Sequence, residues 1–427
     1  MAKIKTRVKK RLAFQSVRGM HDLLPEDQGL WERLRKAARE IGESYNFQRL
    51  DTPLLEKAEL FERGVGEATD IVEKQMYIFK AKDGERLALR PEGTAAVARA
   101  YLEHGMSHWP QPVKLYYFGP MYRREQPQAG RFRQFHQVGF EIFGSDPDPI
   151  YDAQAILTCR RFLEEMKLNK LSLQINTIGC KLCRQPYRKH LLDYYKNQSA
   201  CKNCKKRLLV NPLRVLDCKE KECQEIKKNA PIFLDSLCLA CSHHFKQILE
   251  YLDELKLPYV LNHHLVRGLD YYNRTVFEIF YEGFSDAIAS GGRYDYLTEM
   301  IGGRITPAVG GAIGLERVLL VIKNNNIVFS ARPRSRIFFV HIGDTAKKTA
   351  LSLIEELRRG GIQVEESLGK DSLKAQLRTA DKENLPLALI FGQKEVYERE
   401  IIIRDLRTGG QESVLLSKVV EEVKKRL

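Results

Sequence analysis

Apolar and polar positions along the chain predict a mixture of helices and strands, interrupted by proline and glycine. Residues 25–45 begin with Pro25 and two acidic residues, which is typical of a helix N-terminus, and apolar residues follow at helical spacing. Residues 47–56 predict a strand, in which Pro53 favours an edge or a bend. Residues 85–104 predict a strand, a break at a proline and then a helix.

The segment 114–144 predicts two strands joined by a turn, with the first arm at 114–125 and the second at 131–144. Side chains alternate across a strand, so the second arm has two faces. One face carries Arg131, Arg133, Phe135, Gln137, Gly139 and Glu141. The other carries Phe132, Gln134, His136, Val138, Phe140 and Ile142. The first face is polar with a gap at Gly139, which predicts the floor of a site for a small polar ligand. His136 lies on the apolar alternation, which favours a core histidine.

The middle of the chain contains an insert and several glycine-rich segments. Residues 170–255 form a basic, cysteine-rich unit, which we interpret as an insert. Residues 262–281 predict a loop that leads into a strand, and residues 290–297 predict a glycine turn in front of a strand. Residues 306–322 predict a glycine-rich strand end that passes into a helix.

A linker at 332–336 precedes a compact α/β unit at 333–427. Its predicted strands are 336–343, 362–367, 387–392 and 398–406, and its predicted helices lie near 345–360, near 371–382 and at 417–427. With a core at 17–325 and a basic tail at 1–16, the sequence predicts an α+β protein with more than one domain.

Composition indicates a soluble protein, and the distribution of charge indicates the kind of partner that it binds. The 427-residue chain is 43% hydrophobic and 29% charged, as expected for a soluble globular protein, and it contains no apolar run as long as a membrane span. No apolar segment follows the basic N-terminus, so we expect a cytoplasmic protein. The net charge is +15, and residues 180–241 hold fourteen Lys/Arg against six Asp/Glu. Such a localised basic surface favours a polyanionic partner such as nucleic acid, with a solvated basic face as the alternative.

Eight of the nine cysteines lie in 180–241. We do not expect them to form disulfides, because disulfides are rare in cytoplasmic proteins. The eight cysteines form the pairs Cys180-x2-Cys183, Cys201-x2-Cys204, Cys218-x4-Cys223 and Cys238-x2-Cys241. The first two pairs are 17 residues apart, a zinc-ribbon spacing. The candidate ligands of a structural zinc ion are Cys180, Cys183, Cys201, Cys204, Cys238 and Cys241. Reduced structural thiols are the alternative, and spacing alone does not determine which pairs combine. The pairs His243–His244 and His263–His264 favour a structural role.

Neither a P-loop nor a dinucleotide-binding glycine motif occurs, so arginines would have to hold any nucleotide phosphates. The segment YRREQPQAGRFRQFHQVGFE (122–141) resembles motif 2 of class II aminoacyl-tRNA synthetases, and AVGGAIGLER (308–317) resembles their motif 3. The helix and strand at 25–56 look like motif 1, which implies a homodimer. RGLDYYNRTVFE (267–278) and GGRYD (291–295) are similar to two peptides that characterise histidine–tRNA ligases. The resemblance extends from about Val17 to the C-terminus. It implies a class II catalytic core at 17–325, built on an antiparallel sheet and carrying a helical, cysteine-rich insert, and an α/β anticodon-binding domain at 333–427.

The resemblance implies a role for each matching residue. Arg123 would hold the ATP α-phosphate, Glu125 would contact adenine or Mg²⁺, and Arg317 would hold the γ-phosphate side. Arg267 would contact both the histidine carboxylate and the α-phosphate, which makes Arg123 and Arg267 the catalytic pair. Residues expected to line the histidine pocket are Glu92, Gly93, Thr94, Gln137, Glu141, Tyr271 and Tyr272. Because Tyr271 and Tyr272 are adjacent, we expect only one of them to contact the ligand.

The chemistry of histidine is consistent with these residues. Glu92 can form an ion pair with the ammonium group and Arg267 with the carboxylate. Glu141 and a tyrosine hydroxyl can hydrogen-bond with the two ring nitrogens. The implied reaction is attack of the histidine carboxylate on the ATP α-phosphorus, followed by transfer to a ribose hydroxyl of the tRNA. Arginines and Mg²⁺ would neutralise the phosphate charge.

Four alternatives to this assignment are weighed by residue. A non-catalytic regulatory subunit of ATP phosphoribosyltransferase shares the fold, but it lacks an anticodon-binding unit and has no need of Arg123 and Arg317. A tRNA-binding module without activity would not need both the acids and the arginines. A class II ligase for another amino acid is disfavoured by RGLDYY together with Glu141. Arg123 and Arg317 could instead be surface residues in salt bridges, but their places in a set of motifs in the family's order disfavour that role. Gln126 and Ser290 depart from the residues usual in the family.

Overall fold

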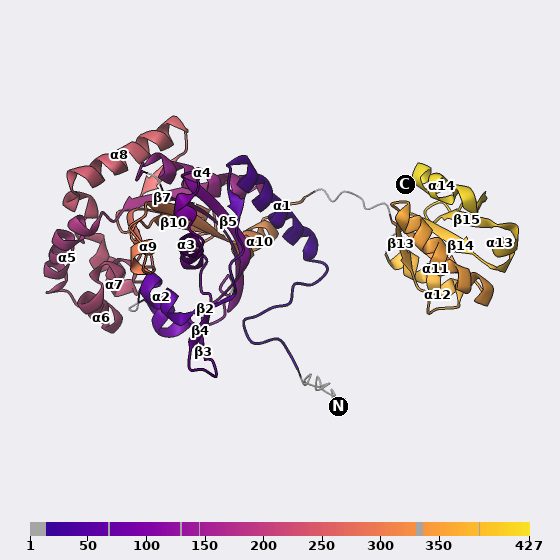
Figure 1. The fold of residues 1–427 in the computed structure, drawn as a ribbon, viewed down its shortest axis with the longest axis horizontal. Helices are drawn as coiled ribbons and strands as arrows, with labels where there is room; N and C mark the ends of the chain where they lie inside the picture. Colours follow the sequence, from indigo (N-terminus) through magenta and orange to yellow (C-terminus); the bar gives the residue numbers. More distant parts are fainter. Residues whose placement is uncertain (1–13, 67–68, 129, 145, 330–335, 384) are drawn as a thin grey trace, which may run out of the picture. The chain divides into compact units, whose positions relative to one another are not determined.

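The computed structural model describes residues 14–427, with gaps at 67–68, 129, 145, 330–335 and 384. Most of the basic tail and nearly all of the linker at 332–336 lie outside the described residues. The chain divides into two compact units, Met1–Val328 and Phe329–Leu427, which are described separately (Figure 1). None of the helices in the described part of the chain is long and apolar enough to cross a membrane.

Unit 1 is built on an eight-stranded mixed sheet. In spatial order the strands are β1 (Gln48–Arg49), β5 (Val113–Tyr122), β6 (Gln134–Phe143), β11 (Ala308–Gly314), β10 (Ala289–Arg293), β9 (Asn273–Tyr281), β7 (Leu171–Thr177) and β8 (Tyr259–Leu261). All neighbours are antiparallel except the outer pairs β1–β5 and β7–β8. The predicted α+β class with an antiparallel core is therefore confirmed.

Helices and a small sheet surround this core. The helices are α1 (Gln28–Ser44), α2 (Ala58–Val65), α3 (Thr94–Glu103), α4 (Ile150–Glu165), α9 (Leu297–Met300) and α10 (Leu315–Asn324). The small antiparallel sheet has the order β2 (Leu55–Lys57), β4 (Arg86–Leu89), β3 (Tyr77–Lys80). Helix α4 packs on β11 and β6, and α1 packs on α4 and β5, so these two helices cover one face of the large sheet.

The β5–β6 hairpin has the predicted alternation of faces. Val138 and Phe140 are fully buried, and the Phe140 ring lies 5.4 Å from that of Phe47, just after α1. The His136 ring centroid lies 4.7 Å from that of Trp31 of α1, and its Nδ1 hydrogen-bonds with Glu316 at 2.8 Å, so the histidine has partners but is half-buried rather than in the core. The opposite face of β6 therefore remains available for the polar site.

Two local predictions were wrong. The segment 47–56 is not one strand: β1 ends at Arg49 and β2 begins at Leu55, in different sheets, because the chain bends around Pro53. Residues 289–293 form strand β10 rather than a glycine turn. The glycines are needed inside the sheet, since a Cβ on Gly291 would lie 2.1 Å from the Gly310 carbonyl oxygen of β11.

The cysteine-rich segment is helical and lies between β7 and β8. Its elements are α5 (Lys181–Tyr195), α6 (Lys202–Val210), the 3-10 helix η3 (Pro212–Asp217), α7 (Lys221–Lys228), the 3-10 helix η4 (Phe233–Ser236) and α8 (Leu239–Glu254). Figure 1 shows these helices gathered on the side of unit 1 away from α1. Residues 171–177 belong to the main sheet as β7, so the helical part begins at Lys181.

Unit 2 is a five-stranded sheet covered by helices. The strand order is β13 (Gln363–Glu366), β12 (Arg336–His341), β14 (Leu387–Phe391), β15 (Glu400–Asp405), β16 (Gln411–Leu415). The helices are α11 (Asp344–Arg359), α12 (Leu373–Lys382), α13 (Gln393–Glu398) and α14 (Val419–Arg426). All seven larger elements begin and end within two residues of their predicted positions, and the sequence pattern missed the short α13 and the exposed β16.

Candidate functional site

A polar cavity of about 160 Å³ lies between the β5–β6 hairpin, β10 and the start of α10. Its lining includes the predicted residues Arg123, Glu125, Gln137, Arg267 and Arg317. The structure therefore brings three arginines from distant parts of the chain to one cavity. This arrangement suits a ligand with several negative charges, because guanidinium groups bind phosphate and carboxylate oxygens in pairs.

Arg123 follows directly after β5 and is held at one edge of its guanidinium. Its Nε donates to the Pro91 carbonyl oxygen at 2.8 Å, and the guanidinium lies over the Phe135 ring at 5.2 Å. These contacts fix the plane of the group and use one of its five N–H donors. Burial lowers the pKa of Arg123 from its ordinary value, and the nearby Glu125 opposes that shift.

Arg317, in the first turn of α10, is anchored by backbone oxygens. Its Nε donates to Gly130 at 3.2 Å and its Nη1 to Ala287 at 2.6 Å. Arg131, from the hairpin turn, also lines the cavity, and its Nη2 lies 3.5 Å from a carboxylate oxygen of Asp286. Arg131 was not among the residues expected at the ATP site, although it lines this cavity.

Arg267 precedes β9 in the chain and lines the cavity, where it reaches side chains of β9 and β10. It donates from Nη1 to the Glu278 carboxylate and from Nη2 to the Ser290 hydroxyl at 2.7 Å. Its guanidinium also lies 5.9 Å from the Tyr272 ring centroid. The Ser290 hydroxyl thus helps to orient the arginine.

A second, buried group of polar residues surrounds the start of α3. Glu92 accepts hydrogen bonds from the backbone nitrogens of Thr94 at 2.7 Å and Ala95 at 2.8 Å, so it caps the helix. The Tyr271 hydroxyl lies 3.4 Å from the same carboxylate. Burial raises the pKa of Glu92, although these hydrogen bonds favour the ionised form.

Glu141 lies on β6, deep in the same group. Thr94 Oγ1 donates to its Oε1 at 2.7 Å, and the Tyr294 hydroxyl donates to its Oε2. Burial raises the pKa of Glu141 to about 8, against the opposing effect of these two hydrogen bonds. Its partner on the neighbouring strand β11 is Gly310, and this position requires glycine because a Cβ there would lie 1.8 Å from Glu141 Oε2.

Tyr117 of β5 lies across the hairpin from Gly139, which is its direct partner in the register. A Cβ on Gly139 or on Gly93 would lie 2.3 Å from the Tyr117 Cζ, so both glycines make room for this ring. The predicted gap at Gly139 is thus filled by a tyrosine. Nearby, Gln137 Oε1 is buried and accepts no hydrogen bond from the described residues, so it can accept one from a ligand.

Tyr271 and Tyr272 do not face opposite ways, which removes the reason for expecting only one of them to contact the ligand. Both precede β9 in a turn, where strand alternation does not apply. Both are buried, and their ring centroids lie 4.6 Å apart. Tyr294 completes the cluster at 5.6 Å from Tyr271. Tyr117, Tyr294 and Ser290 were all missed from the sequence as site residues.

A groove of about 700 Å³ adjoins the polar cavity and shares Arg131, Glu278, Ala287 and Arg317 with it. Its other wall belongs to the insert and carries Lys219, Lys227 and Lys228. The basic insert therefore faces the arginine cavity across an open, positively charged groove.

The insert cysteines form two groups of four in the described ranges of the chain. The outer site consists of Cys180, Cys183, Cys238 and Cys241, and the inner site consists of Cys201, Cys204, Cys218 and Cys223. Within each group the four sulfur atoms lie within 4.8 Å of one another. The first two CxxC pairs, which have a zinc-ribbon spacing, are separated between the two sites, and Cys218 and Cys223 join the candidate set.

Comparison with known proteins gives matches along almost the whole chain. The family model described as histidyl-tRNA synthetase matches residues 19–318, and that described as anticodon binding domain matches residues 334–426. A histidine–tRNA ligase of Thermodesulfovibrio yellowstonii is 44% identical over 419 residues, which covers 97% of this chain and 99% of that protein.

Solved structures agree with this result. The apo histidyl-tRNA synthetase of S. aureus has a TM-score of 0.80 and 32% identity, covering 96% of this chain and 100% of that one. A Bacillus halodurans protein titled as an ATP phosphoribosyltransferase regulatory subunit/histidyl-tRNA synthetase has a TM-score of 0.63 at 20% identity and covers 90% of this chain and 99% of that one, which shows a shared fold alone. The family match, the extent of the identity and the four-arginine cavity agree: the chain belongs to the histidyl-tRNA synthetase family.

Proposed function

We propose that the protein attaches L-histidine to its tRNA through a histidyl-adenylate, using ATP with Mg²⁺. The observation that carries this proposal is the position of the four-arginine cavity beside a buried pocket with two carboxyl groups. A cavity for phosphates and a pocket for an ammonium and an imidazole, joined at Arg267, match the two substrates of the first step.

In the nucleotide cavity, Arg123 would hold the α-phosphate and Arg317 the γ-phosphate side. Glu125 would contact adenine or hold Mg²⁺, for which carboxylate oxygen is a suitable ligand. When bound, Mg²⁺ supplies positive charge that neutralises the phosphate oxygens. Arg131 lines the same cavity and adds a further guanidinium to the phosphate side.

In the amino-acid pocket, each polar group of histidine has a partner. Glu92 would receive the ammonium group together with Gly93 and Thr94, and Arg267 would receive the carboxylate. Glu141 and Gln137 would line the ring, with Tyr271 and Tyr272 closing the pocket. A pocket that hydrogen-bonds its ligand in this way can reject analogues lacking those groups by ~10⁴-fold or more, so no editing site is required.

The first step needs no general base, because the histidine carboxylate is already ionised and attacks the α-phosphorus directly. Arg123 and Arg267 would neutralise the charge that develops on the α-phosphate. Their orientation is fixed in advance, since each is held by neighbours on one edge: Pro91 for Arg123, and Glu278 with Ser290 for Arg267. In the second step a ribose hydroxyl of the tRNA attacks the adenylate and releases AMP.

The tRNA would contact both units. We infer that residues 17–325, including the insert at about 170–255, form the catalytic domain and that residues 333–427 bind the anticodon. The acceptor end would enter along the basic groove of Lys219, Lys227 and Lys228. A homodimer in the cytoplasm completes the proposal, as the family resemblance implies.

The regulatory-subunit alternative receives less support. The Bacillus halodurans neighbour supports only the fold, whereas the ligase relative is far more similar. The chain also has a matching anticodon-binding unit and the cavity arginines Arg123, Arg267 and Arg317. A charging assay with labelled histidine and total tRNA tests the function: label is expected on histidine-accepting tRNA alone, and absence of charged tRNA would contradict it.

A further inference from the structure

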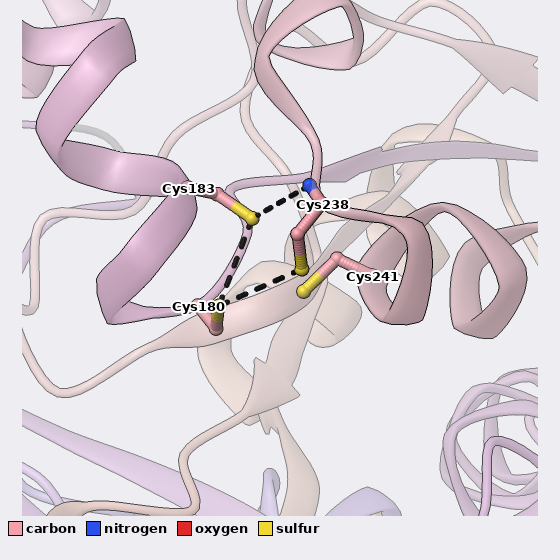
Figure 2. A group of neighbouring side chains, drawn as sticks. All are labelled: Cys180, Cys183, Cys238 and Cys241. Atoms are coloured by element: carbon pink, nitrogen blue, oxygen red, sulfur yellow. Dashed lines mark hydrogen bonds between the residues drawn. The ribbon is translucent and has the colours of Figure 1, made fainter.

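The outer site joins the start of α5, the first helix of the insert, to the start of α8, its last helix (Figure 2). Cys180 Sγ lies 3.6 Å from Cys183 Sγ and 4.0 Å from Cys238 Sγ. Cys241 comes from the first turn of α8, and Figure 2 shows its sulfur beside that of Cys238. Four sulfur atoms from two helix starts therefore surround one small volume.

The inner site repeats this arrangement within the insert. Cys201 and Cys204 lie at the start of α6, Cys218 follows η3, and Cys223 lies in α7. Cys201 Sγ lies 3.9 Å from Cys218 Sγ. All nine cysteines are free thiols, so none of these contacts is a disulfide.

The sulfur separations match a tetrahedral site for one zinc ion. A Zn–S bond is about 2.3 Å long, so the sulfurs of a regular tetrahedron are about 3.8 Å apart. The observed separations of 3.6, 3.9 and 4.0 Å lie around that value. A disulfide would need about 2.05 Å. A cluster of several irons separates its cysteine sulfurs further, because irons and sulfides lie between them.

Backbone N–H groups point at these sulfurs, as they do in thiolate metal sites. The Cys238 nitrogen donates to Cys183 Sγ at 3.1 Å in the outer site. In the inner site, the Cys204 nitrogen donates to Cys201 Sγ and the Cys201 nitrogen to Cys223 Sγ, both at 3.4 Å. Such hydrogen bonds disperse the negative charge of metal-bound thiolates.

We propose that the outer and inner sites each bind one structural Zn²⁺, so that the insert is a two-zinc module. Four thiols lose four protons when an ion binds, which leaves a closed Zn(S-Cys)₄ site with a charge of −2 and no open position for catalysis. The two sites are nested: the sequence segment of the inner site lies wholly between the two pairs of the outer one. Each ion therefore cross-links segments of the insert that are separated in the sequence.

The two sites also position the loop that carries Arg267, Tyr271 and Tyr272, and this step rests on the proposed function. Arg184, next to Cys183 in α5, donates to the Tyr272 carbonyl oxygen.

Asn211, which follows α6 within the inner site's 201–218 segment, donates to Asp270 at 2.8 Å. Loss of either ion would free one of these two supports of the histidine pocket.

Elemental analysis of the purified full-length protein tests the metal content. Two zinc ions per chain are expected, with one lost in Cys183→Ser and one in Cys204→Ser. Cys159→Ser is the matched control, since Cys159 is buried outside both sites, and it should keep both ions. If a variant fails to fold, titration of the native protein with a thiol-blocking mercurial should release two zinc ions per chain. Iron in place of zinc, or fewer than two ions, would overturn the proposal.

The link to the histidine pocket is tested with Asn211→Ala, which leaves every cysteine in place. It should retain two zinc ions and raise the histidine KM about two- to tenfold, the range expected when one typical, partly buried hydrogen bond is lost. An unchanged histidine KM in this variant would overturn the link. A wild-type protein with two zinc ions but no histidine-dependent activity would instead contradict the proposed function alone.

Discussion

The Tyr294 hydroxyl donates a hydrogen bond to the Glu141 carboxylate, and both side chains are completely enclosed. A buried carboxyl group that receives only neutral donors keeps its proton to higher pH than usual. The pKa of Glu141 is accordingly raised from 4.5 to about 8. In the ligand-free protein this residue is therefore protonated at pH 7 and ionises as the pH rises through 8.

Histidine binding should release a proton near neutral pH. An imidazole N–H that donates to Glu141 favours the ionised carboxylate, so the bound state holds fewer protons than the free protein. At pH 7.5 a group with a pKa of about 8 is mostly protonated, so we expect a net release of protons, up to one per histidine bound. Calorimetric titrations in buffers of different ionisation enthalpy measure this number directly.

Glu141→Gln is the control for that measurement, because the amide cannot ionise. Its histidine binding should be weaker and should release no proton from this site. Proton uptake, or no exchange of protons, in the wild-type protein at pH 7.5 would contradict the assigned role of Glu141.

Gly139→Ala should damage the histidine pocket without unfolding the protein. The new Cβ would lie 2.3 Å from the Tyr117 ring, which must move to make room. Overpacking of this kind costs ~1–3 kcal/mol, so we expect the histidine KM to rise about 5- to 150-fold. Gly29→Ala in α1 is the matched control, since its Cβ would meet no atom within 4 Å. Equal kinetics in the two variants would show that Tyr117 does not shape the pocket.

Arg123→Ala should abolish adenylate formation, with a loss of at least about 10³-fold, because a preoriented donor to the developing phosphate charge is removed. Affinity for tRNA should change less than about twofold. Arg161→Ala, which removes an exposed arginine on α4, should leave both quantities unchanged. The result against this role would be intact adenylate formation together with lost tRNA binding.

Replacement of Lys219, Lys227 and Lys228 by glutamine should weaken tRNA binding and flatten its salt dependence. Each lost phosphate contact reduces the slope of log affinity against log salt by about 0.7–0.9, so three contacts should reduce it by about 2–3. The slope comes from filter binding at several salt concentrations. The control changes three exposed lysines outside the groove, Lys36, Lys82 and Lys170, and should preserve the slope. An unchanged slope in the groove variant would assign the basic insert to another purpose.

The sequence predicted the polar face of β6 because strand alternation is strict, and Gln137 and Glu141 lie as expected. Tyr117 was missed because it sits in an apolar stretch, where a tyrosine normally packs. The gap at Gly139 was the one signal for it, since the two residues are partners across the hairpin.

Other misses come from contacts that depend on the fold. Tyr271 and Tyr272 precede their strand, so alternation gave the wrong orientation. The partners of Arg267 come from β9 and β10, and no sequence spacing brings those strands together. The cysteine pairing was equally inaccessible, because it follows the three-dimensional nesting of the insert helices.

The central claim is that the arginine cavity and the buried pocket together activate histidine. Amino-acid-dependent exchange of pyrophosphate into ATP measures this step alone, without tRNA. The account predicts exchange with histidine and with none of the other nineteen amino acids, and loss of that exchange in Arg123→Ala. Exchange that is absent with every amino acid, or that is supported equally well by another one, would contradict it.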